Sequence, residues 1–255
     1  NQPFLIHNHT DASNFRLRDA INRPEDLLDY ALELGLPGIA ITDHATISNH
    51  VRAHRYIEDN KDKFKDFVLG YGDEFYLVEK DTINEAVENN EKTQFYHFLV
   101  LAKNQHGYEF LKKLTTREWQ NSFFYRGMER TPTYFEDIEE LVKGYENDVI
   151  FSSSCIGSLL NQTILRYHES NSKEDKKKIH DFIMFFINLV GKDNFYLELQ
   201  PAIKHDKSNE AIKREQQIVN DMLLQLCKVY DLTPIITTDA HYLNKEQAFA
   251  HKTYL

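Results

Sequence analysis

The feature that most constrains this chain is a repeated pattern in which an apolar run ends in histidine. His7 and His9 follow the first run, at a spacing that places both side chains on one side of a strand. Thr42-Asp43-His44 follows a second run, and Thr238-Asp239-Ala240-His241 follows another near the end of the chain. One such pair could simply cap a strand, but repetition predicts ligands that converge on a metal at one rim of a barrel.

Composition limits the classes of protein that fit. The 255 residues are enough for one large domain or two small ones, and 41% hydrophobic residues can bury a sizeable core. The net charge of −10 argues against binding nucleic acid by phosphate neutralisation alone, so such contact must be local, metal-mediated or made by further domains. Two cysteines, Cys155 and Cys227, indicate a reducing compartment. Without a long apolar span or a signal peptide, we expect a cytoplasmic protein with no membrane contact.

Apolar runs alternate with helical stripes along the chain. Strands are predicted at 4–6, 37–42, 67–78, 95–102, 149–151, 195–199 and 234–237, and helices near 22–35, 47–58, 108–114, 133–142, 179–190 and 218–229. A turn is expected at 70–72, a surface excursion at 82–93 and a long irregular loop at 116–132. About seven buried strands alternating with helices predict an α/β barrel, with a doubly wound open sheet as the alternative.

An ordered set of motifs resembles the PHP (polymerase and histidinol phosphatase) domain, and more closely that of bacterial or phage replicative DNA polymerase III α subunits. The motifs are His7-x-His9, Thr42-Asp43-His44, Asp73-Glu74-Phe75-Tyr76, the run from His97 to Ala102, Cys155, and Asp239-Ala240-His241-Tyr242-Leu243. The resemblance extends from about residue 4 to residue 255. It implies a distorted seven-stranded, TIM-like (β/α) barrel. It also implies that residues 1–255 are a single PHP domain, an N-terminal fragment of a longer DNA polymerase.

The resemblance implies a metal site of nine side chains. The expected ligands are His7, His9, Asp19, His44, Glu74, His97, Cys155, Asp239 and His241, of which His7, His9, Asp239 and His241 are expected to matter most for catalysis. One tetrahedral ion needs about four donors, so nine donors can hold two or three divalent ions. The mixture of imidazole, carboxylate and thiolate favours Zn, Mn or Fe over Mg or Ca.

Some of these assignments have alternatives in the residues themselves. Asp11 is nearer to His9 than Asp19 is and could replace it, or could cap a loop. Glu74 follows a glycine-rich segment and could be solvated, and Cys155 could be an ordinary buried cysteine. His97 stands early in its apolar run, so strand geometry alone makes its convergence with the other ligands less secure.

Other polar residues are weaker candidates for the site. Asp43 could orient His44 from behind, and Glu198 and His205 could lie at the rim or serve packing. Four arginines could receive a phosphate: Arg16, Arg18, Arg126 and Arg130. The remaining histidines fit exposed helix positions: His50, His54, His106, His168, His180 and His251.

Together these features predict a metal-dependent phosphoesterase. The resemblance implies a 3′–5′ exonuclease that acts on the 3′ end of DNA, within a DNA-directed DNA polymerase (a nucleotidyltransferase) active in DNA replication. The implied partners are the remaining polymerase domains and replisome subunits. Two alternatives remain open: a non-catalytic, metal-stabilised scaffold that docks a proofreading subunit, and a stand-alone small-molecule phosphatase such as one for histidinol phosphate.

Overall fold

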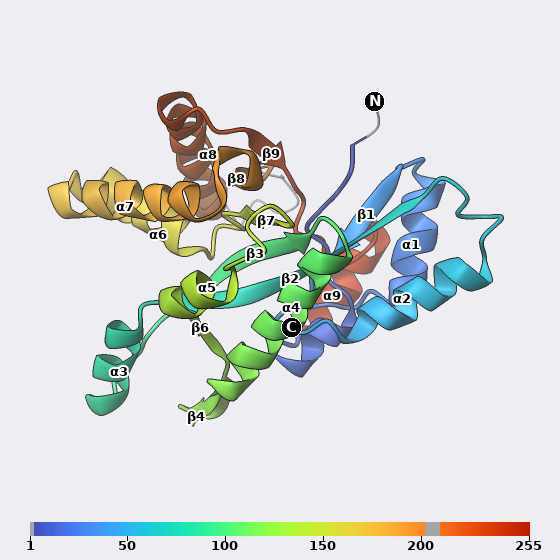
Figure 1. Ribbon diagram of the computed structural model, residues 1–255, viewed down its shortest axis with the longest axis horizontal. Coiled ribbons are helices and arrows are strands. Elements are labelled where there is room, and N and C mark those ends of the chain that lie inside the picture. Colours follow the sequence, from blue (N-terminus) through green and yellow to red (C-terminus); the bar gives the residue numbers. More distant parts are fainter. Residues whose placement is uncertain (1–2, 202–209) are drawn as a thin grey trace.

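A curled β-sheet runs through the computed structural model, which describes residues 3–201 and 210–255 (Figure 1). Helices α1 and α2 lie at one end of the sheet, and α6, α7 and α8 lie at the other. The strands are β1 (Gly38–Ile41), β2 (Val68–Val78), β3 (Tyr96–Ala102), β4 (Phe123–Tyr125), β5 (Met128–Arg130), β6 (Pro132–Tyr134), β7 (Val149–Ser152), β8 (Phe195–Leu199) and β9 (Pro234–Ile236). The α-helices are α1 (Pro24–Glu33), α2 (Ser48–Asp59), α3 (Lys80–Glu88), α4 (Gln105–Gln120), α5 (Phe135–Leu141), α6 (Leu159–Ser170), α7 (Lys173–Val190), α8 (Glu210–Tyr230) and α9 (Ala248–Tyr254). Short 3₁₀ segments η1 (Asp11–Phe15), η2 (Lys192–Asn194) and η4 (Lys245–Gln247) connect some of them.

One strand of the sheet runs against the others. The order is β1-β2-β3-β7-β8-β9, with β6 beside β2. Strand β3 is antiparallel to both β2 and β7, whereas the other pairs in this sheet are parallel. Single parallel bridges join Leu5 to Ile39 and Asn8 to Ala240, so the N-terminal segment contacts both the first strand and the segment after the last. The α/β class is confirmed, while the closed seven-stranded barrel stays a prediction.

The main core lies between the sheet and helices α4 to α8. Phenylalanine rings form its centre: Phe186 of α7 stacks on Phe98 of β3 with ring centres 4.4 Å apart, and on Phe195 of β8 at 5.2 Å. All three side chains are fully buried. Burying such large apolar surfaces is the dominant favourable term in folding. The core therefore fixes the relative positions of the strand ends that carry the site.

The predicted turn at residues 70–72 is wrong, because β2 is one continuous strand. A Cβ atom on Gly70 would lie 2.8 Å from the Cβ of Ala40, and one on Gly72 would lie 2.6 Å from the carbonyl oxygen of Val100. Both glycines thus allow close approach of the neighbouring strands β1 and β3. In sequence alone, a glycine that permits close packing cannot be distinguished from one that permits a turn.

The predicted surface excursion at 82–93 and the predicted irregular loop at 116–132 both contain regular structure. Helix α3 occupies most of the predicted surface excursion and buries Ile83 and Ala86. Helix α4 continues to Gln120, and β4 and β5 then form a separate two-stranded sheet. The extension of α4 was missed because Glu118, which is fully buried on the same helix as Leu111 and Leu114, breaks the apolar pattern.

Gly107, in the first turn of α4, packs against the backbone before β7. A Cβ atom there would lie 2.0 Å from the carbonyl oxygen of Asp148, an acceptor that also binds the Lys103 amide. Gly107→Ala is therefore expected to destabilise the fold by about 2 kcal/mol, the typical cost of overpacking. Denaturant unfolding measures the change. Gly157→Ala is the control, because its Cβ would meet nothing closer than 3.5 Å, and equal losses in both variants would contradict the packing argument.

Candidate metal centre

Four segments of the sheet and the N-terminal segment bring their polar residues to one edge. His44 follows β1, Glu74 lies in β2, Cys155 follows β7, and the segment after β9 carries Asp239 and His241. His44 and Glu74 form a parallel bridge, and the amide of His9 donates to the carbonyl oxygen of Ala240. Parallel strands whose ends meet at one edge explain this convergence.

His97 reaches the same edge because β3 is reversed. It pairs with Tyr76, near the end of β2, while Leu99 pairs with Ser152 at the end of β7. The first residues of an antiparallel strand lie beside the last residues of its neighbours. An early position in the apolar run is thus the one that brings His97 into the site.

Glu74 lies at the centre of the cluster. Its side chain is 1% exposed, and its two carboxylate oxygens lie 3.2 Å from Nε2 of His7, 3.3 Å from Nε2 of His9, 2.9 Å from Nδ1 of His44 and 3.3 Å from Nδ1 of His97. The solvated alternative for Glu74 is therefore wrong. A carboxylate surrounded by four imidazoles is suited to bridging cations that the same imidazoles bind.

Two aspartates connect the remaining histidines. Oδ1 of Asp239 lies 3.2 Å from Nε2 of His7 and 3.1 Å from Nε2 of His9. Oδ2 of Asp19 lies 3.0 Å from Nε2 of His44 and 3.5 Å from Nε2 of His241. Both aspartates and His241 are partly exposed, as is His97, so these four residues form the open side of the cluster.

Asp11 does not enter the cluster. Its carboxylate accepts a hydrogen bond from Asn49 and lies 3.6 Å from Arg52, both of which belong to α2. Asp19 reaches the histidines because Asn14 binds its backbone amide and turns the segment back. Asp11 is closer to His9 in sequence, but the alternative in which Asp11 is the ligand instead of Asp19 is wrong.

Cys155 also contacts the cluster. Its sulfur lies 3.5 Å from Nδ1 of His97 and 4.0 Å from Oε1 of Glu74. Ser154, just before it, donates to the same Glu74 oxygen at 2.6 Å. Burial raises the pKa of the Cys155 thiol well above its ordinary value, so a nearby cation would be needed to favour the thiolate.

The chemistry of the cluster fits divalent cations. Ligand atoms lie within 4.8 Å of one another in three overlapping groups: His9 with His44 and His241, His7 with His9 and Asp239, and His44 with Glu74 and His97. Several buried atoms that lie within ion-pair distance of one another here make no well-aligned hydrogen bond, including Nε2 of His7, Nε2 of His9, Nδ1 of His44 and Oε2 of Glu74. Such unpaired polar atoms are costly unless a ligand satisfies them, and cations of the Zn, Mn or Fe type match nitrogen and oxygen donors.

Charges inside the cluster shift the pKa values of its histidines in opposite directions. Burial lowers the pKa of His9 to about 3, which keeps its imidazole neutral and able to donate a lone pair. Burial also opposes protonation of His44, but Glu74 and Asp19 outweigh it and raise the pKa of His44 to about 9. A cation that binds this histidine must therefore displace a proton.

A second carboxylate orients His7 from behind. Glu198 is fully buried, and its Oε1 lies 2.7 Å from Nδ1 of His7, so that Nε2 is left pointing into the cluster. Ser152 and Thr237 both donate hydrogen bonds to the same carboxylate. This is the arrangement by which outer carboxylates fix the tautomer of metal-binding histidines. Glu198 thus lies behind the cluster rather than at its rim.

Asp43 supports His9 rather than the ring of His44. Its carboxylate accepts from the Thr10 amide at 2.6 Å and from the Ser13 hydroxyl at 2.8 Å. The Ser13 oxygen in turn lies 3.0 Å from Nδ1 of His9 and accepts from the backbone amide of His44. The expectation that Asp43 orients the His44 ring is therefore wrong, and Ser13 was missed because serine carries no distinctive signal in sequence.

The backbone is strained at or next to three of the candidate ligands. Asp239 has φ of 49°, Ala45 after His44 has 52°, and Ser154 before Cys155 has 60°. Non-glycine residues adopt this left-handed conformation only at an energetic cost, and such residues cluster at functional sites. Of the seven non-glycine residues with positive φ among the described residues, these three lie in or beside the cluster.

Several other sequence-based candidates lie away from the cluster. His50 is 1% exposed against Tyr71, so its predicted exposed position is wrong, and burial lowers its pKa to about 4. Asp73 is fully buried and accepts from Thr115. His205 lies outside the described residues.

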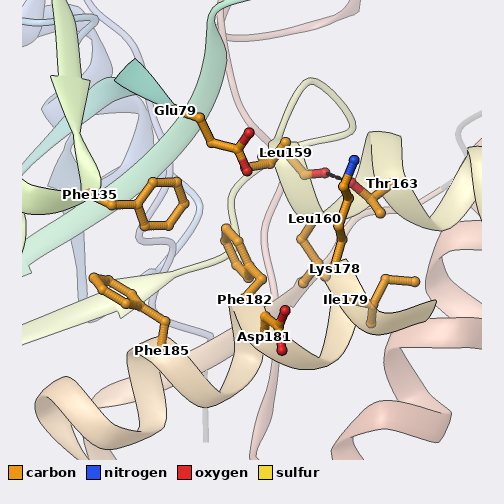
Figure 2. Close-up of a pocket in the computed structure, with 10 residues that line it drawn as sticks. All are labelled: Glu79, Phe135, Leu159, Leu160, Thr163, Lys178, Ile179, Asp181, Phe182 and Phe185. Atoms are coloured by element: carbon orange, nitrogen blue, oxygen red, sulfur yellow. Dashed lines mark hydrogen bonds between the residues drawn. The ribbon is translucent and has the colours of Figure 1, made fainter. Parts of the chain in front are cut away.

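The apolar pocket between α5, α6 and α7 is separate from the cluster. Figure 2 shows the rings of Phe135, Phe182 and Phe185 around this pocket, with Lys178 at its side. The cavity volume is about 250 Å³. None of the nine candidate ligands lines it. Among the described residues, no helix is both long enough and apolar enough to cross a bilayer.

An α/β sheet whose strand ends gather histidines, carboxylates and a thiol is typical of metal-dependent enzymes. The PHP domain model matches residues 6–202, and the chain belongs to this family. The resemblance noted in the sequence is thereby confirmed.

Curated relatives cover nearly the whole chain. It is 39% identical over 261 residues to the probable DNA polymerase YorL of Bacillus subtilis, and equally to a DNA-directed DNA polymerase of Bacillus phage SPbeta. It is 31% identical over 246 residues to the DNA polymerase III subunit alpha of Borreliella burgdorferi. These matches take in 98%, 98% and 96% of the chain but 19% of each relative, so the chain spans about a fifth of their length.

Solved structures support the fold. A protein from Bifidobacterium adolescentis assigned as a metal-dependent phosphoesterase superposes with a TM-score of 0.50 at 17% identity, covering 96% of this chain and 89% of its own. An amidohydrolase from Chromobacterium violaceum gives a TM-score of 0.52 at 11% identity, covering 93% and 87%. At such identities the likeness establishes the fold alone.

Proposed function

We propose that the nine clustered residues bind two or three divalent transition-metal ions and that the domain is a metal-dependent 3′–5′ exonuclease. The observation that carries the proposal is the buried Glu74 carboxylate in contact with four imidazoles, beside buried nitrogen and oxygen atoms without partners. Zn, Mn or Fe would suit these donors. When bound, such ions make water a nucleophile near neutral pH and neutralise phosphate oxygens.

The protein's own residues would hold and orient this chemistry. His7, His9, Asp239 and His241 would be the most important for catalysis, and Asp19, His44, Glu74, His97 and Cys155 would complete the ligand set. Glu198 fixes the ring of His7 and Ser13 that of His9, which leaves one nitrogen of each ring facing inward. The partly exposed side, formed by Asp19, His97, Asp239 and His241, would admit a phosphodiester.

The DNA polymerase relatives support DNA as the substrate. We propose that the chain is a single PHP domain of a DNA polymerase, with its nucleotide-transfer site in other domains, which would be its partners together with replisome subunits. The acidic composition agrees with this division, because a basic surface for duplex DNA would then belong to those domains.

The activity is tested on 5′-labelled DNA with the protein loaded with Zn²⁺, Mn²⁺ or Fe²⁺. The expected result is a ladder of products that shorten one nucleotide at a time from the 3′ end and disappear with chelator. Intact DNA at every metal loading, with a folded protein, would favour the scaffold. Hydrolysis of histidinol phosphate without any action on DNA would favour the small-molecule phosphatase.

Asp19 and Asp11 provide a matched pair for the ligand assignment. Asp19→Asn is expected to reduce metal content by at least one ion, because the amide is a weaker ligand beside His44 and His241. Asp11→Asn should retain the full content, since Asp11 contacts Asn49 and Arg52 instead. Elemental mass spectrometry of the purified proteins measures both, and equal metal content in the two variants would remove Asp19 from the ligand set.

A further inference from the structure

Two arginines from distant parts of the sequence lie beside the metal centre. Arg16 directly follows η1, and Arg130 ends β5. The guanidinium of Arg16 lies 5.1 Å from the ring centre of Tyr76 and donates to the carbonyl oxygen of Glu129. The guanidinium of Arg130 lies 4.9 Å from the ring centre of Phe95. The β4–β5 hairpin and the loop that leads to Asp19 therefore meet at these arginines.

Neither arginine has an acidic partner within ion-pair distance among the described residues. Arg16 is only 8% exposed, and its Nε atom is buried without a hydrogen-bond partner, as is Nε of Arg130. The hydroxyl of Tyr76, on a side chain 3% exposed, is also buried and unpaired. Buried polar groups normally have partners, so three unpaired donors in one region indicate a missing acceptor.

The two positive charges are close enough to oppose one another. Burial lowers the pKa of Arg130, and the charge of Arg16 lowers it further. Glu118 is near Arg16 but forms no ion pair with it, and burial and Asp73 raise the pKa of the Glu118 carboxyl well above its usual range. Unpaired like charges held together in this way favour an anion between them.

Tyr76 links the arginines to the metal centre. Its ring stacks against His44 with ring centres 6.0 Å apart and meets the edge of His97 at 5.4 Å. Arg16 lies over the same ring, so one aromatic side chain separates it from two candidate ligands. The nearby Asp19 and His97 belong to the open side of the cluster.

We propose that Arg16, Arg130 and the Tyr76 hydroxyl bind a phosphate of the DNA strand adjacent to the phosphate that is cleaved at the metal centre. This inference rests on the proposed function and deepens it. Guanidinium groups bind phosphate through paired, charge-assisted hydrogen bonds, which suits a partly buried anion site. The subsite would select substrates with at least two successive phosphates over small esters with one.

Two substrates separate this subsite from the metal centre. A (dT)10 oligonucleotide offers successive phosphates, whereas thymidine 5′-(p-nitrophenyl phosphate) has only one. In metal-loaded protein, Arg130→Ala and Arg16→Ala are expected to raise KM for (dT)10 about tenfold, as for a lost charge-assisted hydrogen bond, with less than a twofold change for the single ester. Equal losses on both substrates, or none on either, would overturn the proposal.

Matched controls come from the same segments. Arg18 and Arg126 are exposed, and Arg126 donates to the carbonyl oxygen of Asn90, which follows α3. Arg18→Ala and Arg126→Ala should leave both KM values unchanged. Arg130→Lys keeps the charge but loses the paired donors, so it should recover only part of the affinity for (dT)10, which separates phosphate binding from any loss of folding.

Binding without turnover keeps the inference testable if the exonuclease proposal fails. Anisotropy of fluorescein-labelled (dT)10 with metal-free protein gives the dependence of affinity on salt. Removal of one phosphate contact from a single strand reduces the slope of log affinity against log salt by about 0.7. Arg130→Ala is expected to show this reduction and Arg126→Ala is not. Identical slopes in wild type and Arg130→Ala would rule out the contact, whatever the hydrolytic result.

Discussion

Replacing Glu74 with glutamine is expected to remove at least one metal ion and to reduce hydrolysis about a thousandfold or more. The amide keeps the shape of the side chain but loses the negative charge that lies against four imidazoles. Metal ions contribute several kcal/mol of transition-state stabilisation, which corresponds to a loss of this size. Metal content by elemental mass spectrometry and the rate of 3′-end shortening are the two measurements.

Asp73→Asn is the control for this experiment. Asp73 is the adjacent residue in β2 and is equally buried, but strand alternation points its side chain away from the cluster, toward Thr115. This variant should keep its full metal content. A Glu74→Gln protein with unchanged metal stoichiometry would refute a bridging role for Glu74.

The largest loss of stability is expected from Glu198→Ala. The substitution leaves Nδ1 of His7 and the hydroxyls of Ser152 and Thr237 without their shared acceptor, in a region with no access to water. Breaking a buried charged pair costs about 3 to 5 kcal/mol. Denaturant unfolding measures the free energy, and titration with Zn²⁺ should show an affinity reduced by about 10- to 100-fold, as for other carboxylates behind a metal ligand.

Glu198→Gln serves as the matched variant. Its amide oxygen can still accept from Ser152 or Thr237, so the loss of stability should be smaller, while the support for His7 is weakened. A loss below about 1 kcal/mol in Glu198→Ala would contradict the argument that the shared buried acceptor stabilises the fold.

Much of the fold was predictable because local patterns and tertiary packing agree. Strand β8 coincides with its prediction, and α7 ends just before Gly191 as predicted but begins at Lys173 rather than near residue 179. An apolar run or stripe and a terminating glycine point to the same structure at these positions. The reversed direction of β3 was not predictable, because the residues of a buried strand do not record which way it runs. The turn predicted at Gly70 and Gly72 was wrong for a similar reason, because the role of these glycines depends on neighbours that are distant in sequence.

The candidate site was predictable at the level of residue types more than of contacts. All nine candidate ligands lie in one cluster, although their roles as ligands stay a prediction. The place of Asp19 in the cluster depends on a loop conformation set by Asn14. The importance of Ser13 and Glu198 depends on which ring nitrogen of a histidine each one faces. Such choices are made by hydrogen-bond geometry after folding, which sequence spacing does not specify.

The bridges between the N-terminal segment and the residues after β9 have a consequence for synthesis. His7 and His9 leave the ribosome long before Asp239 and His241, which follow only after nearly all of the described sheet. Contacts between such distant residues form late, because a long loop must close first. A nascent chain therefore presents only part of the proposed ligand set, and a complete metal centre would form only once the last strand has joined the sheet.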